Sequence, residues 1–345
     1  MRPRHTFSDA EAPPAGRIPG LMLAAGLALA ALALGRWQPL IGAPVFGIAL
    51  GVLVRQAFAP GLRFAPGIAF GASQVLQASV IALGFGLGLD QVARVGLDSL
   101  AVTLVTMSAA FLAAWLLGRW LRVGRTLTLL VGVGTAICGG SAIAAVTPIL
   151  RASAHDTAFA ISTIFLFNLV AVLLFPALGH ALGLTDAGFG LWAGTAINDT
   201  SSVVAAGYAY SAAAGDYATI VKLTRATLIV PICLGLVAVM AWRSKRDAAA
   251  PGAARPPLWR IVPWFILGFL ASAGLRSAGL IPAPALPWLA ALAHGLMVVA
   301  LCAVGLGADL RRMAATGPRP ILLGLGVWIA VATSALAVQH ALGRL

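Results

Sequence analysis

The sequence predicts an all-α, polytopic integral membrane protein. Its 345 residues are 60% hydrophobic and 10% charged, and its mean hydropathy is +0.97, whereas a soluble domain of this size needs far more polar surface. Apolar runs of about 20 residues, the length that crosses a hydrocarbon core, recur between short charged loops. We expect a cytoplasmic tail over residues 1–17 and a single transmembrane transporter domain over residues 18–345.

The apolar runs predict eleven transmembrane helices. A second run follows the first almost at once and no clear cleavage site separates them, which argues against a signal peptide. The eighth run is long enough to require tilt. The expected spans are 18–35, 40–57, 66–88, 98–118, 126–149, 157–179, 186–206, 216–242, 259–275, 286–308 and 319–339.

The positions of Lys and Arg predict the orientation. With the N-terminus inside, the inner segments carry 16 of the 23 basic residues and the outer segments carry 5. Cytoplasmic loops are enriched in Lys and Arg, so we expect a multi-pass protein of the bacterial inner membrane with a cytoplasmic N-terminus. The net charge of +13 then reflects topology and lipid contact rather than nucleic acid, because no basic stripe with interleaved aromatics occurs.

An internal similarity predicts inverted repeats. The segments GFGLGLD (84–90) and AVGLGAD (303–309) share Gly-Leu-Gly-x-Asp and close spans that lie seven apart, so they point in opposite directions. Chance is the alternative, because Gly and Leu are abundant. A second pair, GTAICGGS (134–141) and GTAINDTS (194–201), lies in parallel spans, and its origin stays open.

The fifth span contains a cluster of weak helix formers. Gly costs about 1 kcal/mol against Ala inside a helix, so Gly139 and Gly140 predict discontinuous helices here. Broken backbone is tolerated in a membrane only where protein buries it or where it lines a cavity. The new helix N-terminus attracts anions, and Ser141 is placed to cap it or to donate to the anion. Close packing on small residues is the alternative.

The seventh span contains a polar cluster. Its five consecutive polar residues cannot share one helix face, so we expect an unwound turn that lines a cavity. An intramembrane carboxylate such as Asp199 indicates a functional group, here the site of the coupling ion. A loop end is the alternative. The cluster is Asn198, Asp199, Thr200, Ser201 and Ser202.

Two basic residues lie inside the eighth span. Lys222 and Arg225 are three apart and therefore share a helix face. Lys222 is the shallower of the two and can snorkel outward. We expect them to pair with Asp199 or to supply positive charge to a tetrahedral oxyanion, which suits the donor fork of Arg.

The remaining polar residues and cysteines carry weaker expectations. The three cysteines form neither a CxxC pair nor a metal-ligand spacing, so we expect no metal and no cofactor. Cys233 and Cys302 are expected to be buried as small hydrophobes. Interhelical hydrogen bonds are expected from Gln74, Gln77, Asn168 and His294, and helix ends from Asp90 and Asp309.

Three segments occur in the order ICGGSAIAA, NDTSSVVAAG and IVKLTR, and GLGADL and PRPILLG follow them. In these segments the chain resembles the YeiH-type sulfate exporter family, and the resemblance covers nearly the whole chain from residue 18. It implies an antiporter-like fold with inverted repeats and crossed discontinuous helices. Many members carry a His-acidic pair before VVAAG, whereas this chain has Asn198 and Asp199. Proton coupling through that histidine would here pass to Asp199 or differ altogether.

We therefore expect a secondary active transporter that exports a small anion, sulfate or a related oxyanion, coupled to a proton or sodium gradient. Alternating access would move one repeat against the other. Asp199 is expected to hold the coupling ion. The expected substrate-binding residues are Cys138, Gly139, Gly140, Ser141, Asn198, Thr200, Ser201, Lys222 and Arg225.

Other classes of protein stay open. A cation/proton antiporter would use Asp199 as its ion site, with Arg225 as a structural partner. A pump and an intramembrane enzyme are disfavoured, because GxxxxGK[ST], HExxH, GxGD and GxSxG are all absent from the sequence. A channel would differ by flux that does not saturate. Analogy with antiporter-like folds suggests a homodimer.

Overall fold

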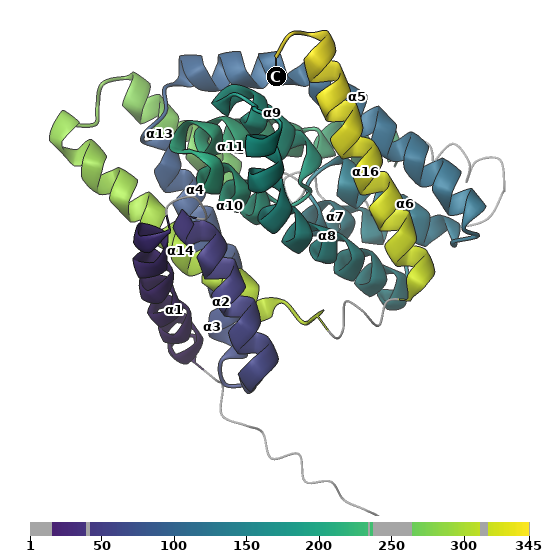
Figure 1. The fold of residues 1–345 in the computed structure, drawn as a ribbon, viewed down its shortest axis with the longest axis horizontal. Helices are drawn as coiled ribbons and strands as arrows, with labels where there is room; N and C mark the ends of the chain where they lie inside the picture. Colours follow the sequence, from purple (N-terminus) through teal and green to yellow (C-terminus); the bar gives the residue numbers. More distant parts are fainter. Residues whose placement is uncertain (1–15, 39–41, 234, 237–263, 311–316, 345) are drawn as a thin grey trace, which may run out of the picture.

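The computed structural model of the protein describes residues 16–38, 42–233, 235–236, 264–310 and 317–344. Within these ranges the chain is helical and contains no strand (Figure 1). The elements, in chain order, are α1 (Ile18–Trp37), α2 (Gly42–Phe58), α3 (Ala65–Phe70), the π-helix η1 (Gly71–Val75), α4 (Leu76–Gly84), α5 (Leu89–Trp120), α6 (Arg125–Ala136), α7 (Gly140–Leu150), α8 (Ala154–Ala181), α9 (Asp186–Ala196), α10 (Thr200–Tyr210), α11 (Ala212–Thr227), α13 (Trp264–Ser277), the 3-10 helix η3 (Ala283–Ala285), α14 (Leu286–Gly307) and α16 (Pro318–Ala341).

Six helical stretches of the described residues are long and apolar enough to cross a membrane, and each coincides with a predicted span. The other five predicted spans correspond to the shorter α2, to two broken helices, and to α11 and α13. Because α11 and α13 flank residues 237–263, which lie outside the described residues, the count of eleven stays a prediction, as do the inverted repeats. The six stretches are Ile18–Trp37, Ala65–Gly84, Leu89–Trp120, His155–Ala181, Ala283–Gly307 and Pro318–Ala341.

The helices pack as two groups. In Figure 1, α1, α2 and α14 lie at the left and α6 and α16 at the right. The first group comprises α1 to α4, α13 and α14, and α14 packs against α1, α2 and α4. The second group comprises α5 to α11 and α16, with α11 between α9 and α10, and α16 along α5. The groups meet mainly where α10 packs on α2 and where α13 packs on α5.

Close approach of backbones holds the first group together. An added Cβ at Gly51 of α2 would collide with the backbone of α14 near Cys302 and Gly305. A Cβ at Gly305 would in turn collide with the backbone of α2 at Ile48. Lipid is as apolar as the helices, so the hydrophobic effect does not drive membrane helices together. Small residues allow the close backbone packing whose dispersion attraction does so instead.

Side-chain caps fix where four helices of the second group begin. An N-cap oxygen satisfies an amide that the first helical turn leaves unpaired. Each cap accepts a hydrogen bond from an amide two or three residues further on. The caps are Ser153 for α8, Thr185 for α9, Asp199 for α10 and Ser211 for α11.

Candidate functional site

Two of the predicted spans are each broken into two half-helices. The helix of the predicted span 126–149 ends as α6 at Ala136 and resumes as α7 at Gly140. The helix of the predicted span 186–206 ends as α9 at Ala196 and resumes as α10 at Thr200. The predicted interruption of each span is therefore confirmed.

The two breaks lie against each other. Gly139 has a φ of 67°, a conformation that L side chains rarely adopt. A Cβ built on Gly139 would lie 3.6 Å from the backbone carbonyl of Asn198 in the other break. Gly139 thus precedes the first residue of α7 and lets the second break approach its backbone.

Lys222 of α11 joins the two breaks from inside the protein. Its side chain is fully buried. The Nζ donates to the carbonyl of Ile137 at 3.0 Å and to the carbonyl of Ile197 at 2.9 Å. Each acceptor directly follows the end of a half-helix, where carbonyls lack an intrahelical donor.

Arg225, one turn further along α11, binds the same two helix ends and is also fully buried. Its Nε donates to the carbonyl of Ala136 at 2.6 Å, and its Nη2 to that of Thr135 at 2.6 Å. Its Nη1 donates to the carbonyl of Thr195. Helix C-termini carry partial negative charge, so the guanidinium is both hydrogen-bonded and electrostatically matched.

This arrangement corrects the pairing expected for the two basic residues. Neither Lys222 nor Arg225 forms an ion pair with Asp199, so that prediction is wrong. A buried cation must be hydrogen-bonded to offset its lost hydration, and here the carbonyls of both breaks supply the acceptors. The ion pairs among the described residues are Arg55–Asp309, Arg94–Asp90 and Arg344–Asp98.

Asp199 instead caps the N-terminus of α10. Its carboxylate accepts from the amide of Ser201 at 3.0 Å and from the hydroxyl of the same residue. The Oδ1 of Asn168 in α8 accepts from the amides of Asn198 and Asp199, at 3.2 and 3.3 Å. The expected interhelical role of Asn168 is confirmed, since it holds the unwound segment in place.

The helix N-terminus at α7 differs from the expected one. The N-cap is Gly139, which offers no side-chain acceptor. The hydroxyl of Ser141 turns back and donates to the carbonyl of Cys138 at 3.0 Å. Ser141 is the second residue of α7, past the cap position, so the prediction that it caps this half-helix is wrong.

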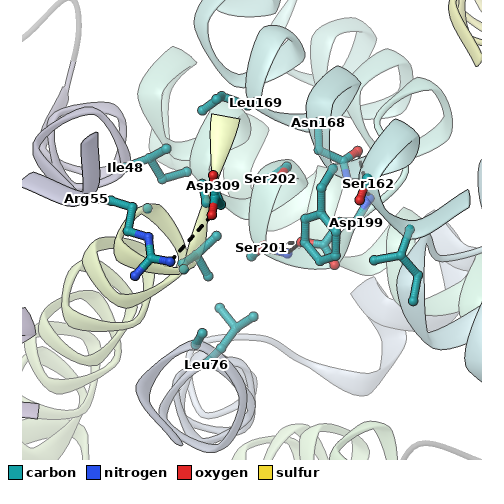
Figure 2. Close-up of a pocket in the computed structure, with 17 residues that line it drawn as sticks. Ile48, Arg55, Leu76, Ser162, Asn168, Leu169, Asp199, Ser201, Ser202 and Asp309 are labelled. Carbon is teal, nitrogen blue, oxygen red and sulfur yellow. Dashed lines mark hydrogen bonds and ion pairs between the residues drawn. The ribbon is translucent and has the colours of Figure 1, made fainter. Parts of the chain in front are cut away.

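A cavity of about 390 Å³ lies between the two groups of helices. Figure 2 shows Asp199 and Asn168 on the side of the second group, with Arg55 and Asp309 opposite them. The Nη2 of Arg55 lies 3.6 Å from the Oδ2 of Asp309. Both charged side chains are about one-third exposed, at 31% and 33%, so the ion pair is partly hydrated.

Two of the predicted site residues, Asp199 and Ser201, line this cavity. The ring of Phe165 lines it as well and lies next to Gly140, so it separates the cavity from the start of α7. The predicted residues that the structure keeps out of the lining are Cys138, Gly139, Gly140, Ser141, Asn198, Thr200, Lys222 and Arg225.

Sequence reasoning missed the opposite wall of the cavity. Arg55 lies near the end of the predicted span 40–57 and carried no expectation of its own, and Asp309 was expected only to end a helix. The sole signal in the sequence is that both interrupt apolar segments near their ends. Ser162 of α8 also lines the cavity and carried no signal at all.

Two buried polar atoms beside the breaks lack a hydrogen-bond partner among the described residues. They are the Nδ2 of Asn168 and the Oδ1 of Asn198. Such atoms are rare in folded proteins and need water or a ligand. The break at Asp199 therefore offers one donor and one acceptor beyond those that the fold uses.

The family model described as conserved hypothetical protein 698 matches residues 19–324. The chain belongs to this family.

Its relatives are bacterial and closely matched in length. A UPF0324 membrane protein of Streptococcus pyogenes serotype M18 is 43% identical over 334 residues, which cover 95% of this chain and 98% of the relative. A UPF0324 membrane protein of Streptococcus agalactiae serotype V is 40% identical over 340 residues, with the same coverage. One of Fusobacterium nucleatum is 36% identical over 344 residues, or 94% of this chain and 98% of the relative.

These names identify a membrane protein family and assign it no substrate. The membrane class predicted from composition is confirmed at this level. The expected similarity to YeiH-type sulfate exporters, and with it the transport of an oxyanion, stays a prediction.

Proposed function

We propose that this protein of the 698 family is a secondary active transporter that moves a small oxyanion together with a proton or sodium ion bound at Asp199. The observation that carries the proposal is the cavity between the two helix groups. It joins a carboxylate in a helix break to Arg55 on the opposite wall. Transporter sites of this kind form where discontinuous helices meet the interface of two moving units.

The charge around the breaks supports an anionic substrate. Lys222 and Arg225 contribute two positive charges when both are protonated, and the C-termini of α6 and α9 offset about half a charge each. The N-termini of α7 and α10 contribute about half a positive charge each. The negative charge of the Asp199 carboxylate roughly cancels these two contributions. The centre then retains about one positive charge, which an anion in the adjoining cavity would offset.

The same charges suggest how the two solutes are coupled. An oxyanion that binds Arg55 must displace Asp309 and would share the cavity with Asp199. Two like charges in one low-dielectric cavity repel strongly. A cation at Asp199 removes this repulsion, so cation and anion bind together and the direction of flux follows their combined gradients.

Flux of radiolabelled sulfate into proteoliposomes tests the proposal. We expect saturable uptake by the wild-type protein that responds to a pH or sodium gradient. Asp199→Asn should abolish the response to the gradient. Arg55→Gln should weaken the apparent sulfate affinity roughly tenfold or more, because a charge-assisted hydrogen bond is lost.

Arg94→Gln is the matched control, because Arg94 is exposed and pairs with Asp90 outside the cavity lining. Unchanged sulfate flux in Arg55→Gln would refute the anion site. Flux that does not saturate would indicate a channel.

A cation/proton antiporter is the second candidate, and one observation favours it. The basic residues expected to hold an anion donate instead to backbone carbonyls, and the cavity lining holds two aspartates against one arginine. An antiporter would show no sulfate flux. It would release protons when sodium is added, and this release would be lost in Asp199→Asn and kept in Arg55→Gln.

A further inference from the structure

A second hollow lies between α5 and α6, remote from the breaks. It has a volume of about 720 Å³ and is built around the turn that joins the two helices. Three arginines at intervals of three residues, Arg119, Arg122 and Arg125, line it, together with Trp115 and Thr128. No acidic residue is among the lining residues. We call this hollow the α5–α6 groove.

The three arginines of the α5–α6 groove are available to a ligand. All three are exposed. None of them appears in an ion pair, side-chain hydrogen bond or cation–π contact with the described residues. Three positive charges held this close repel one another unless an anion lies between them.

The walls of the groove are in close contact, and the surface beside it is apolar. A Cβ on Gly132 would lie 3.0 Å from the Cβ of Ala114, so α5 and α6 are in close contact. Trp115 is 62% exposed, Leu116 50% and Trp120 77%. Exposed Trp beside Leu at the end of an apolar helix is typical of the membrane–water interface.

We propose that the α5–α6 groove binds the phosphate headgroup of an anionic membrane phospholipid. The three guanidinium groups would hold the phosphate oxygens, because Arg forms bidentate hydrogen bonds to phosphate. The acyl chains would lie along Leu116 and the neighbouring apolar face of α5. A basic pocket between membrane helices is the arrangement that anionic headgroups select. The proposal is independent of the transported substrate.

Native mass spectrometry of the detergent-purified protein with added cardiolipin, phosphatidylglycerol or phosphatidylethanolamine tests the proposal. We expect bound cardiolipin and phosphatidylglycerol to survive at activation energies that remove phosphatidylethanolamine. Each basic residue near the headgroup contributes roughly fivefold in affinity. The triple variant R119Q/R122Q/R125Q should therefore bind the anionic lipids roughly 100-fold more weakly.

The triple variant R36Q/R94Q/R151Q is the matched control, because it removes the same charge from exposed sites on separate parts of the chain. It should keep wild-type lipid binding. Equal losses in both triple variants would mean unspecific attraction and overturn the proposal. So would full competition by millimolar inorganic phosphate, which would indicate a site for the free ion.

If the groove triple variant does not fold, the three single Arg→Gln variants replace it. Each should lose roughly fivefold in affinity, and wild-type binding in all three would overturn the proposal. The triple Arg→Lys variant keeps the charge but loses the bidentate hydrogen bonds, so it should bind the anionic lipids more weakly than the wild type and more tightly than the triple Arg→Gln variant.

Discussion

Lys222 and Arg225 are buried charges whose partners are backbone carbonyls. Together they donate to five carbonyls at the ends of α6 and α9. In a membrane these carbonyls have no water to bind, and each unsatisfied group costs several kcal/mol. The two side chains therefore make the breaks possible.

Truncation of either residue should destabilise the protein. Lys222→Ala leaves two buried carbonyls without a donor and Arg225→Ala leaves three, at about 1–3 kcal/mol for each group. We expect Arg225→Ala to be the more damaging in thermal unfolding of the detergent-purified protein. Arg94→Ala, which removes an exposed pair, should change stability by less than about 1 kcal/mol. Stability as high as that of Arg94→Ala in both variants would contradict this role.

Asp199 caps α10, and under the proposed function it is also the ion site, so the two roles can be tested separately. Asn caps helices about as well as Asp, so Asp199→Asn should keep the unfolding temperature close to that of the wild type. It cannot bind a proton or sodium ion as a carboxylate does, so coupling should be lost. Asp199→Ala should lose coupling and also about 1 kcal/mol of stability. A strongly destabilised Asp199→Asn would mean that charge, and not capping, holds α10.

At the scale of elements, the break at α6–α7 depends on one backbone conformation. Gly139→Ala forces a methyl group onto a residue with a φ of 67° and a ψ of −128°, a conformation largely restricted to glycine, which costs roughly 1–3 kcal/mol. Gly140→Ala places its Cβ at an ordinary 3.5 Å from the ring of Phe165 and should be nearly neutral. Denaturant unfolding of the two variants measures the difference, and equal stabilities would argue that the break is not strained.

The sequence predicted the breaks but not what stabilises them. Gly139–Gly140 and the polar run at Asp199 are local signals, because weak helix formers and intramembrane charge are unfavourable at those positions. The contact of Arg225 with Thr135 and Ala136 spans about 90 residues. Every residue has a backbone carbonyl, so the residue types at 135 and 136 do not indicate that their carbonyls accept these hydrogen bonds. The anion role expected of Arg225 followed from its charge alone.

At the scale of the whole molecule, the two helix groups enclose the cavity and must move if substrate is to cross. A Cβ on Gly42 of α2 would lie 3.8 Å from the Cβ of Ala209 in α10, a distance within the range of a disulfide. The φ of Gly42 is 74°, so a cysteine at this position is strained but can be reached by the partner. Gly42→Cys with Ala209→Cys, in a background without the three free cysteines, should therefore cross-link the groups. We expect the oxidised form to lose transport and the reduced form to regain it.

A bond within one group provides the control for this experiment. A Cβ on Gly47 of α2 would lie 3.2 Å from the Sγ of Cys302 in α14, so Gly47→Cys can be oxidised with Cys302 retained. Both helices belong to the first group, and transport should continue. Transport by the oxidised Gly42–Ala209 pair would show that the groups do not separate there.

Hydropathy predicted the membrane class and eleven spans, six of which coincide with long apolar helices of the described residues, because the length of an apolar run is a property of the local sequence. It could not predict which helices form each group. Lipid and protein offer similar apolar surroundings, so the grouping depends on shape, as at Gly51 and Gly305. The cavity wall that contains Arg55 and Asp309 exists only because the helices group in this way. It could therefore not be predicted from the sequence either.

The bonds from α11 to the breaks also have a consequence for biosynthesis. The segments of α6 to α10 are synthesised before Lys222 and Arg225, so five backbone carbonyl groups lack their hydrogen-bond donors until α11 is made. Until α11 is in place, the unpaired carbonyls of the two broken segments need hydrogen bonds from water or from the insertion machinery. Without such bonds these segments are unfavourable in the bilayer core. The two breaks of the second group therefore gain these donors only when α11 is made, and α16, the last helix of the group, packs on helices whose breaks already have their donors.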